Sequence, residues 1–321
     1  MFTPSKRQTK IVFWGSSLFS LPALQKLFAS EYKISAIVTQ SDKPSGRGKR
    51  NSENIIKKWA LKHKIDVLQP ERATEVGFIN SLKIIKPDVF VIVSYGKILK
   101  KNILEIPKHG SLNIHASLLP KYRGASPIQA AILNGDTTIG VCIMVLDQGM
   151  DTGPIVSKNE IHLDDTDTAG TMENKLAEVG GNLLINILPD WLGDKILPIP
   201  QIEIAASYCG KISKSDGKIQ WTSNAIEIER KIRAFNPWPS AWSKLSKTGE
   251  LVKFHSAKVV DNKTSPHLAG QIYFVDTKKI AVACGKNSAV LLDIIQPANK
   301  KPMTAYEYYL GHHELLSSTF E

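Results

Sequence analysis

Cysteines and long apolar runs are scarce in this sequence of 321 residues. Its three cysteines, Cys142, Cys209 and Cys284, lie far apart and form no CxxC pair, which excludes a disulfide scaffold and a zinc site made of cysteines alone. No segment approaches the 18 uninterrupted apolar residues of a membrane-spanning helix. The basic first ten residues lack the apolar core of a secretory signal and are too short for a typical organellar transit peptide. We therefore expect a cytoplasmic protein with no membrane partner.

Three common site motifs are also missing. The first apolar run, Ile11 to Gly15, continues into GSSLFS rather than GxGxxG, so we assign no nicotinamide or flavin cofactor. The lack of a GxxxxGK(S/T) loop excludes P-loop phosphate transfer. No Ser, Cys or Lys lies in a nucleophile motif such as GxSxG, which disfavours a covalent acyl-enzyme. In any acyl transfer, the attacking group is therefore expected to belong to the substrate.

Short apolar runs alternate with stretches of helical periodicity in the first part of the chain. IVFWG and ISAIVT flank one helical stretch, and further strand-like runs follow at 88–96, 111–120 and 139–149. This alternation is typical of βαβ units. It predicts an α/β domain with a Rossmann-like, mainly parallel sheet over residues 1–189.

The C-terminal third of the chain has a different pattern and a positive charge. A Pro- and Gly-punctuated stretch predicts a linker at 190–207, and the short strand-like runs that follow predict a small OB-like β-barrel at 208–321. Lys and Arg number 41 against 30 Asp and Glu, and more than half of the net charge of +11 lies in this barrel region. Such an excess favours an anionic partner, either nucleic acid or an acidic metabolite.

Residues 110–153 contain the densest cluster of residues that could take part in catalysis. Asn113 and His115 are two apart on an expected strand, so their side chains leave the same face, while Ile114 points into the packing. An amide can donate to an oxyanion and an imidazole can relay a proton, so the pair suits acyl transfer. Asp151, in the loop QGMDTG, could orient or ionise His115. By pattern alone, polar residues that only cap a strand explain Asn113 and His115 equally well.

A metal site is a weaker interpretation of the histidines. His109 and His115 lack the i, i+4 spacing of a helical ligand pair, and no third ligand is evident. His312 and His313 fit a solvated tail better than a ligand pair. We therefore expect no metal.

The run SLNIHASLLPKYRGASPIQ, followed by LDQGMDTGPI, resembles the signature region of folate-dependent formyltransferases. The segments IVFWGSSLFSLPAL, IVTQSDKPSGRGKR, PDVFVIVSYGKIL and KIRAFNPWPSAW extend the resemblance from about Lys10 to Gly311, and they are similar to members that act on charged initiator tRNA. Unlike a lone glycine motif, a match of this length is specific.

The resemblance implies a reaction and its residues. Asn113, His115 and Asp151 take the places of the catalytic Asn, His and Asp. The implied folate-binding residues are Ser117, Leu118, Leu119 and Pro120. The implied reaction moves a formyl group from the co-substrate 10-formyltetrahydrofolate to the α-amino group of methionine on initiator methionyl-tRNA, supporting translation initiation. It needs no metal, because the folate nitrogen is an adequate leaving group once protonated.

The basic segment SDKPSGRGKR lies between the second expected strand and the next helix. Taken alone, it fits a solvated basic loop better than a loop that follows phosphates. In the family this insertion contacts the acceptor end of the tRNA, so the resemblance favours the second role. The implied tRNA-binding residues are Lys43, Arg47, Lys49 and Arg50. We expect initiator methionyl-tRNA as the partner of a monomeric enzyme.

Two other functions compete with this one. A sugar-amine N-formyltransferase would use the same folate donor and the same three catalytic residues, but it should not need the SGRGKR loop or a strongly basic barrel. A tRNA-binding protein without catalysis is disfavoured by the joint presence of Asn113, His115 and Asp151. A glycinamide ribonucleotide formyltransferase would have no use for the second domain.

Overall fold

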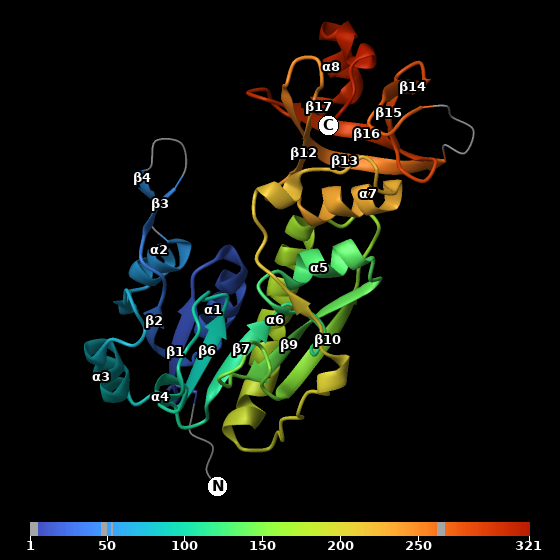
Figure 1. Ribbon diagram of the computed structural model, residues 1–321. Helices are drawn as coiled ribbons and strands as arrows, with labels where there is room; N and C mark the ends of the chain where they lie inside the picture. Colours follow the sequence, from blue (N-terminus) through green and yellow to red (C-terminus); the bar gives the residue numbers. More distant parts are fainter. Residues whose placement is uncertain (1–5, 46–49, 53, 262–266) are drawn as a thin grey trace. The chain divides into compact units, whose positions relative to one another are not determined.

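The structure, a computed structural model, describes residues 6–45, 50–52, 54–261 and 267–321 (Figure 1). No helix in these ranges is long and apolar enough to cross a membrane. The chain forms two compact units. The N-terminal unit consists of Met1–Pro127, Thr138–His162 and Glu173–Cys209, and the C-terminal unit consists of Ile128–Thr137, Leu163–Met172 and Gly210–Glu321.

A seven-stranded sheet forms the centre of the N-terminal unit, in the order β10-β9-β7-β6-β1-β2-β5. Its strands are β1 (Lys10–Gly15), β2 (Lys33–Val38), β5 (Val67–Leu68), β6 (Val89–Val93), β7 (Ser111–His115), β9 (Thr138–Val145) and β10 (Ile155–His162). Strands β7, β6, β1, β2 and β5 are parallel to one another. By contrast, β9 runs antiparallel to β7, and β10 runs antiparallel to β9. The prediction of a mainly parallel sheet is confirmed.

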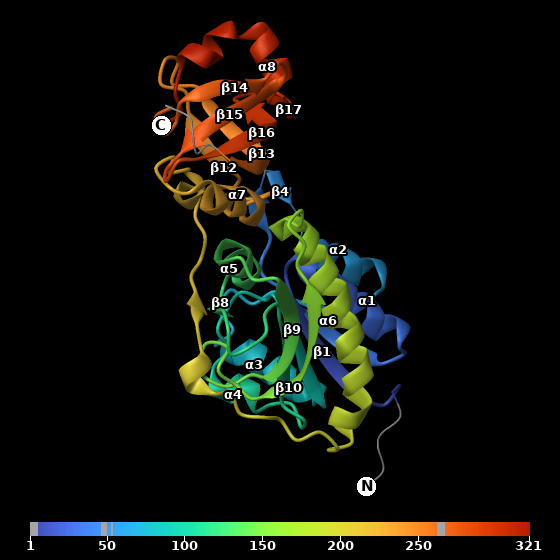
Figure 2. The same cartoon turned by 90° about the vertical axis from the view of Figure 1, so that its right-hand side faces the viewer.

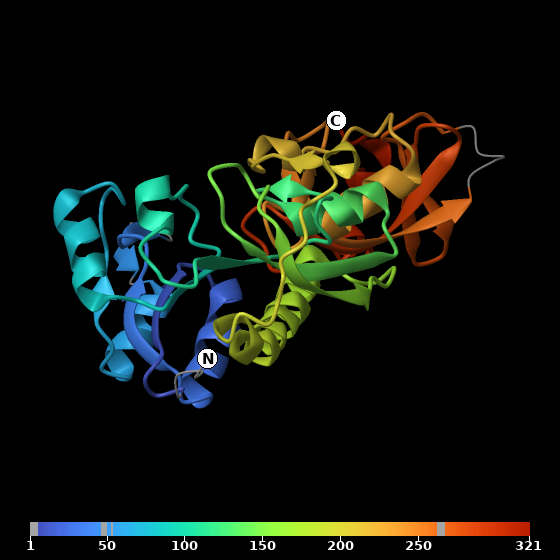
Figure 3. The same cartoon turned by 90° about the horizontal axis from the view of Figure 1, so that it is seen from below.

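Helices cover both faces of this sheet. They are α1 (Leu21–Ala29), α2 (Ile55–Lys62), α3 (Val76–Ile85), α4 (Lys101–Leu104) and α6 (Ala169–Leu192), with the short 3-10 turns η1 (Leu18–Ser20) and η2 (Glu203–Ala205). α1 and α6 lie side by side on one face (Figure 2, Figure 3), where Lys26 of α1 forms a 2.9 Å ion pair with Glu178 of α6. α3 and α4 pack on the other face around Trp14, Phe90 and Ile92.

The long helix α6 was not evident from the sequence. It contains Gly180, Gly181 and Pro189, residues that are typical of breaks rather than of helix interiors. Gly180 is required by close packing, because a Cβ there would lie 2.8 Å from the Ile114 side chain of β7. The helix continues to Leu192 and therefore includes the first part of the punctuated stretch that we interpreted as a linker.

Two small strand pairs stand outside the large sheet. β3 (Lys43–Ser45) and β4 (Arg50–Ser52) pair antiparallel with each other, and β8 (Arg123–Gly124) pairs in parallel with β11 (Tyr208–Cys209). The first pair belongs to the basic segment SDKPSGRGKR. The second joins residues that are 85 positions apart, and it bears on the candidate site.

The C-terminal unit is an antiparallel sheet in the order β12-β13-β16-β15-β14, with β17 paired to β16. Its strands are β12 (Ala241–Lys244), β13 (Leu251–Asp261), β14 (Ile272–Asp276), β15 (Lys279–Cys284), β16 (Ser288–Pro297) and β17 (Met303–Thr304). Its helical elements are α5 (Pro127–Asn134, of which Pro127 falls in the first unit), α7 (Ala225–Ala234), α8 (Ala305–Gly311), η3 (Ser215–Gly217) and η4 (His313–Ser317). α8 begins with a capping box between Thr304 and Glu307.

The last residues of the chain close this sheet into a barrel. Phe320 bridges to Leu245 next to β12, and Thr319 bridges to Gln271 next to β14, so the tail joins the two edge strands. The Phe320 ring packs against Trp221 and Phe254 in the core, with ring centroids 5.4 and 5.2 Å away. The barrel predicted from the strand pattern is thus formed, with a final segment that the pattern did not reveal.

Candidate active site

Asn113 and His115 lie on β7, all five residues of which are buried. The side chains of Asn113 and His115 are on the face opposite Ile114, which packs against α6. These residues are 9% and 6% exposed, so each is nearly removed from solvent. The expected shared face of the two residues follows directly from the strand.

The surroundings of His115 determine where its protons lie. Its Nε2 is 2.9 Å from the Tyr122 carbonyl oxygen, which only accepts, so Nε2 carries a hydrogen and donates it. Its Nδ1 faces Asp151 Oδ2 at 3.6 Å, and a carboxylate also only accepts. Acceptors therefore face both ring nitrogens, and together they fix the orientation of the ring.

Asp151 reaches His115 by a route that the sequence did not indicate. Because β9 is antiparallel to β7, the loop after β9 begins beside Leu112, at the amino end of β7, and not at its carboxyl end. The loop then folds back over the face that carries His115. Asp151 has a φ of +55°, in the left-handed region, and its Oδ2 accepts a 2.8 Å hydrogen bond from the Gly124 backbone N–H. That bond and the imidazole fix its carboxylate.

The Asn113 amide is available for a ligand. Within the described part of the chain its side chain makes no hydrogen bond, although the residue is 9% exposed. Buried amides normally have partners, so a nearly buried and unpaired amide is suited to a group supplied from outside. Beside the His115 imidazole two residues along the same face, it can donate to an oxygen that becomes negative.

The loop after β7 contains the four residues implied for folate. Ser117 Oγ donates to the Lys121 carbonyl at 2.6 Å, and Leu119 packs against Cys142 and Met144 of β9. Burial raises the pKa of the Cys142 thiol to about 11, so this side chain is an apolar packing partner. Ser117 and Leu119 are thus held within the protein, whereas Leu118 and Pro120 are half-buried, and Leu118 lies against Gly140 of β9.

The four residues implied for tRNA binding lie in and around the β3–β4 hairpin. Lys43 begins β3 and Arg50 begins β4, while Arg47 and Lys49 fall outside the described residues. The base of the hairpin is anchored at Asp42. Its carboxylate accepts hydrogen bonds from Lys57 Nζ at 2.6 Å, the Asn54 N–H at 3.3 Å and Gln69 Nε2 at 3.4 Å. The hydrogen bond from Lys57 lowers the pKa of the Asp42 carboxyl, which keeps this anchor charged.

Sequence reasoning missed the groups that orient the catalytic candidates. The Tyr122 carbonyl and the Gly124 N–H are backbone atoms, so no residue type marks them. Arg123, between them, is fully buried. The sequence pattern of KYRG does not distinguish a buried arginine from a solvated one, so only the fold reveals the burial of Arg123.

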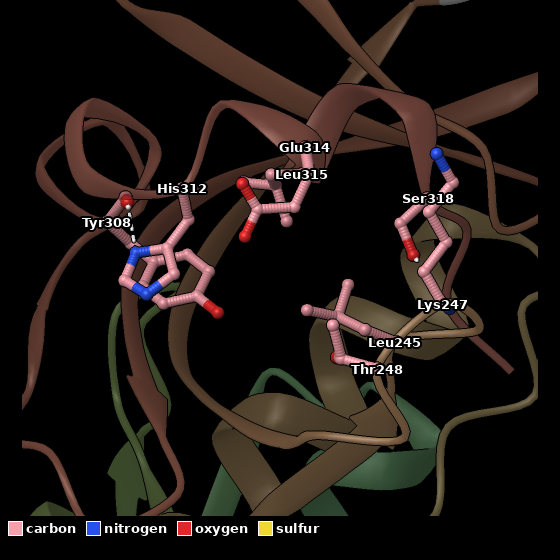
Figure 4. Close-up of a pocket in the computed structure, with 8 residues that line it drawn as sticks. All are labelled: Leu245, Lys247, Thr248, Tyr308, His312, Glu314, Leu315 and Ser318. Atoms are coloured by element: carbon pink, nitrogen blue, oxygen red, sulfur yellow. Dashed lines mark hydrogen bonds between the residues drawn. The ribbon is translucent and has the colours of Figure 1, made fainter.

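Metal sites and enclosed cavities are the two other site types to consider in the described residues. No group of three or more His, Cys, Asp or Glu residues in them could hold a metal ion. The C-terminal unit contains a cavity of about 10 Å³, enough for roughly one water molecule (Figure 4). The cavity is lined by Leu245, Lys247, Thr248, Tyr308, His312, Glu314, Leu315 and Ser318. It is too small for a metabolite.

Comparisons with known proteins cover most of the chain. A family model described as formyl transferase matches residues 9–188, and one described as the formyl transferase C-terminal domain matches residues 211–313. A methionyl-tRNA formyltransferase of Methylacidiphilum infernorum is 42% identical over 303 residues, which cover 94% of this chain and 95% of the relative. The methionyl-tRNA formyltransferase of Nitrosomonas eutropha is 40% identical over 303 residues, with the same coverage.

Solved structures share the fold at lower identity. An N-formyltransferase from Helicobacter canadensis, in complex with folinic acid and dTDP-3-aminofucose, superposes with a TM-score of 0.65 at 20% identity and covers 89% of this chain and 99% of its own. A methionyl-tRNA formyltransferase from Clostridium thermocellum gives a TM-score of 0.53 at 18% identity, covering 78% and 93%. At these identities, the likeness concerns the fold alone.

Proposed function

We propose that this chain, which belongs to the formyl transferase family, transfers a formyl group from 10-formyltetrahydrofolate to the α-amino group of methionine on initiator methionyl-tRNA. The observation that carries the proposal is the pairing of His115 with Asp151 at 3.6 Å beside the unpaired amide of Asn113. Relatives about 40% identical over nearly the whole chain bear the name of this activity, which supports the choice of acceptor.

Formyl transfer requires stabilisation of a developing negative oxygen. The uncharged α-amine attacks the formyl carbon, the C=O bond opens, and a tetrahedral intermediate with one negative oxygen forms. The Asn113 amide donates an N–H to that oxygen, and the positive imidazolium of His115 stabilises it through its charge. A site already arranged in this way avoids reorganising water around the new charge.

The reaction also moves one proton. The attacking nitrogen loses a proton and folate N10 gains one as its bond to the formyl carbon breaks. The products are N-formylmethionyl-tRNA and tetrahydrofolate. The His115–Asp151 pair relays this proton, because the Asp151 carboxylate can accept it from the attacking amine and the imidazole beside it can pass a proton on. The chemistry requires neither a metal nor a covalent enzyme intermediate.

Binding of the two substrates is assigned to different segments. Residues 117–120 follow the catalytic strand directly and contact the folate. Lys43, Arg47, Lys49 and Arg50 contact tRNA phosphates from the basic hairpin. We assign catalysis to residues 1–189, further tRNA contact to the basic barrel at 208–321 and a connecting role to 190–207, in a cytoplasmic monomer.

A sugar-amine N-formyltransferase is the second candidate. Its support is the structural similarity to a sugar 3N-formyl transferase and to an N-formyltransferase in complex with dTDP-3-aminofucose, each with a TM-score of 0.65. Those enzymes are about 20% identical to this chain, whereas the methionyl-tRNA formyltransferases are about 40% identical. The basic hairpin and the basic barrel also have no role on a small sugar nucleotide.

One assay separates the two candidates. Purified protein is incubated with 10-formyltetrahydrofolate and either charged initiator methionyl-tRNA or a dTDP-linked amino sugar, and the formylated product is quantified. We expect turnover on the tRNA and none on the sugar. Turnover only on the sugar, or none on the tRNA with folate donor present, would contradict the proposal.

A further inference from the structure

The segment before the C-terminal unit, residues 199–209, is attached to the loop that follows the catalytic strand; we call this segment the strap. The Arg123 N–H donates to the Ser207 carbonyl at 2.8 Å, the Ser207 N–H donates to the Pro120 carbonyl at 3.2 Å, and the Ala125 N–H donates to the Cys209 carbonyl at 3.2 Å. These bonds lie directly beside Tyr122 and Gly124, the backbone groups that hold His115 and Asp151. The strap is therefore part of the site's framework.

One strap side chain contacts the loop of Asp151 itself. Gln201 Nε2 donates to the Asp151 carbonyl at 2.8 Å and to the Gly153 carbonyl at 2.7 Å. Its Oε1 accepts from Arg123 Nε at 3.0 Å. The next three strap residues are exposed, whereas Gln201 is half-buried and points inward. Both donors and the acceptor of its amide are thus used, which fixes the amide orientation.

Arg123 connects Gln201 to the rest of the strap. Its guanidinium donates to both carboxylate oxygens of Glu203, at 3.0 and 2.9 Å, and to the Tyr208 hydroxyl at 2.9 Å. Arg123 is fully buried, and its hydrogen bonds with Glu203 raise its pKa above the ordinary value. A buried and permanently charged arginine thus holds the Gln201 oxygen, which turns the two amide hydrogens toward the Asp151 loop.

We propose that Gln201 is a positioning residue that holds Asp151 against His115. Asp151 has a left-handed backbone, a conformation that residues other than glycine adopt rarely and that surrounding contacts must hold in place. Gln201 holds the carbonyls on both sides of Thr152, which fixes the backbone that carries the carboxylate. This inference rests on the proposed function, because it assigns Gln201 a role in the same reaction.

The test compares Gln201→Glu with Gln201→Ala and with a matched control, Gln220→Glu, at an exposed glutamine outside the site. Gln201→Glu keeps the acceptor for Arg123 but removes both donors and places a carboxylate against two carbonyl oxygens. We expect both Gln201 variants to lower kcat about 10- to 100-fold, as loss of outer positioning groups commonly does, with KM for tRNA and folate within about twofold of wild type. Gln220→Glu should retain wild-type kcat.

A second variant separates positioning from stability. Glu203→Gln weakens the contact with buried Arg123 while leaving the Gln201 bonds to the loop in place. It should therefore lower Tm but reduce kcat much less than Gln201→Glu does. If Gln201→Glu keeps kcat within twofold of Gln220→Glu, or if Glu203→Gln lowers kcat as much as Gln201→Glu, the inference is wrong. An inactive wild-type protein would instead remove the proposed function, so the two failures are distinguishable.

Discussion

Strand β7 and the β3–β4 hairpin contribute to the proposed reaction in different ways. Every residue of β7 is buried, and the strand is paired on both sides within a seven-stranded sheet. The hairpin strands have three residues each and pair only with each other. Catalysis depends on the position of each reacting atom to within tenths of an ångström, so a buried strand that is paired on both sides is a suitable support for the proposed catalytic residues. Phosphate binding depends mainly on charge and less on exact position, so a small hairpin outside the large sheet can carry the proposed phosphate contacts.

The candidate catalytic residues and the hairpin are also anchored by different kinds of groups. His115 and Asp151 are oriented by the backbone atoms of Tyr122 and Gly124, which a mutation of those side chains would not remove. The hairpin is anchored by side-chain bonds at Asp42. Substitutions should therefore cause steep losses in turnover at the catalytic strand and graded, salt-dependent losses in tRNA use at the hairpin.

The largest effect is expected at the His–Asp pair. His115→Ala and Asp151→Asn should each lower kcat/KM for formylation by about 10³-fold or more, because they remove the proton relay and the charge near the oxyanion. His313→Ala, at an exposed histidine of the C-terminal unit, should retain activity. Formylation of charged initiator tRNA measures both. An active His115→Ala variant would contradict the mechanism.

A somewhat smaller loss is expected for Asn113→Ala. It removes a single donor to the oxyanion, which is worth about 10²–10³-fold in kcat. Because the Asn113 amide makes no hydrogen bond within the described chain, Tm should change little, in contrast to the usual cost of altering a buried polar residue. A large fall in Tm together with unchanged kcat would assign Asn113 a structural role.

Neutralising the hairpin should cause a graded loss. Replacing Lys43, Arg47, Lys49 and Arg50 by alanine should reduce kcat/KM for tRNA about 10- to 100-fold and reduce the slope of log(kcat/KM) against log[salt] by about one per residue that contacts phosphate. KM for the folate donor should be unchanged. The matched control replaces four exposed lysines of the same unit, Lys83, Lys86, Lys100 and Lys101. Equal losses in both quadruple variants would show a general charge effect.

The smallest effect concerns stability at the strap. The Arg123 hydrogen bonds lower the pKa of the Glu203 carboxyl, which is 73% exposed at its side chain. A lowered folded-state pKa stabilises the fold above the ordinary pKa of about 4.5, and the gain is lost as pH falls through the folded value. Glu203→Gln should thus lower Tm by a few degrees at pH 7, with the difference shrinking below about pH 4.5. A constant difference across this range would contradict the charge contribution.

The local elements follow from sequence periodicity. The strands that became β1, β2, β6, β7 and β9 were predicted from short apolar runs, because burial on both faces of a sheet selects such runs. The shared face of Asn113 and His115 follows from the two-residue repeat of a strand. By contrast, α6 was hidden by Gly180, Gly181 and Pro189, and the closure of the barrel by residues 319–321 had no pattern long enough to detect.

The candidate site divides in the same way. Residue types and their spacing were compatible with Asn113, His115 and Asp151 as partners in acyl transfer but fitted strand caps equally well, and the family resemblance favoured the first interpretation. The proximity of Asp151 to His115, the burial of Arg123 and the contacts of Gln201 were decided by the tertiary structure alone. They depend on the antiparallel pairing of β9 with β7, on a loop that folds back, and on a hydrogen bond between Gln201 and Asp151, which are 50 positions apart. A sequence pattern contains no distances between such segments.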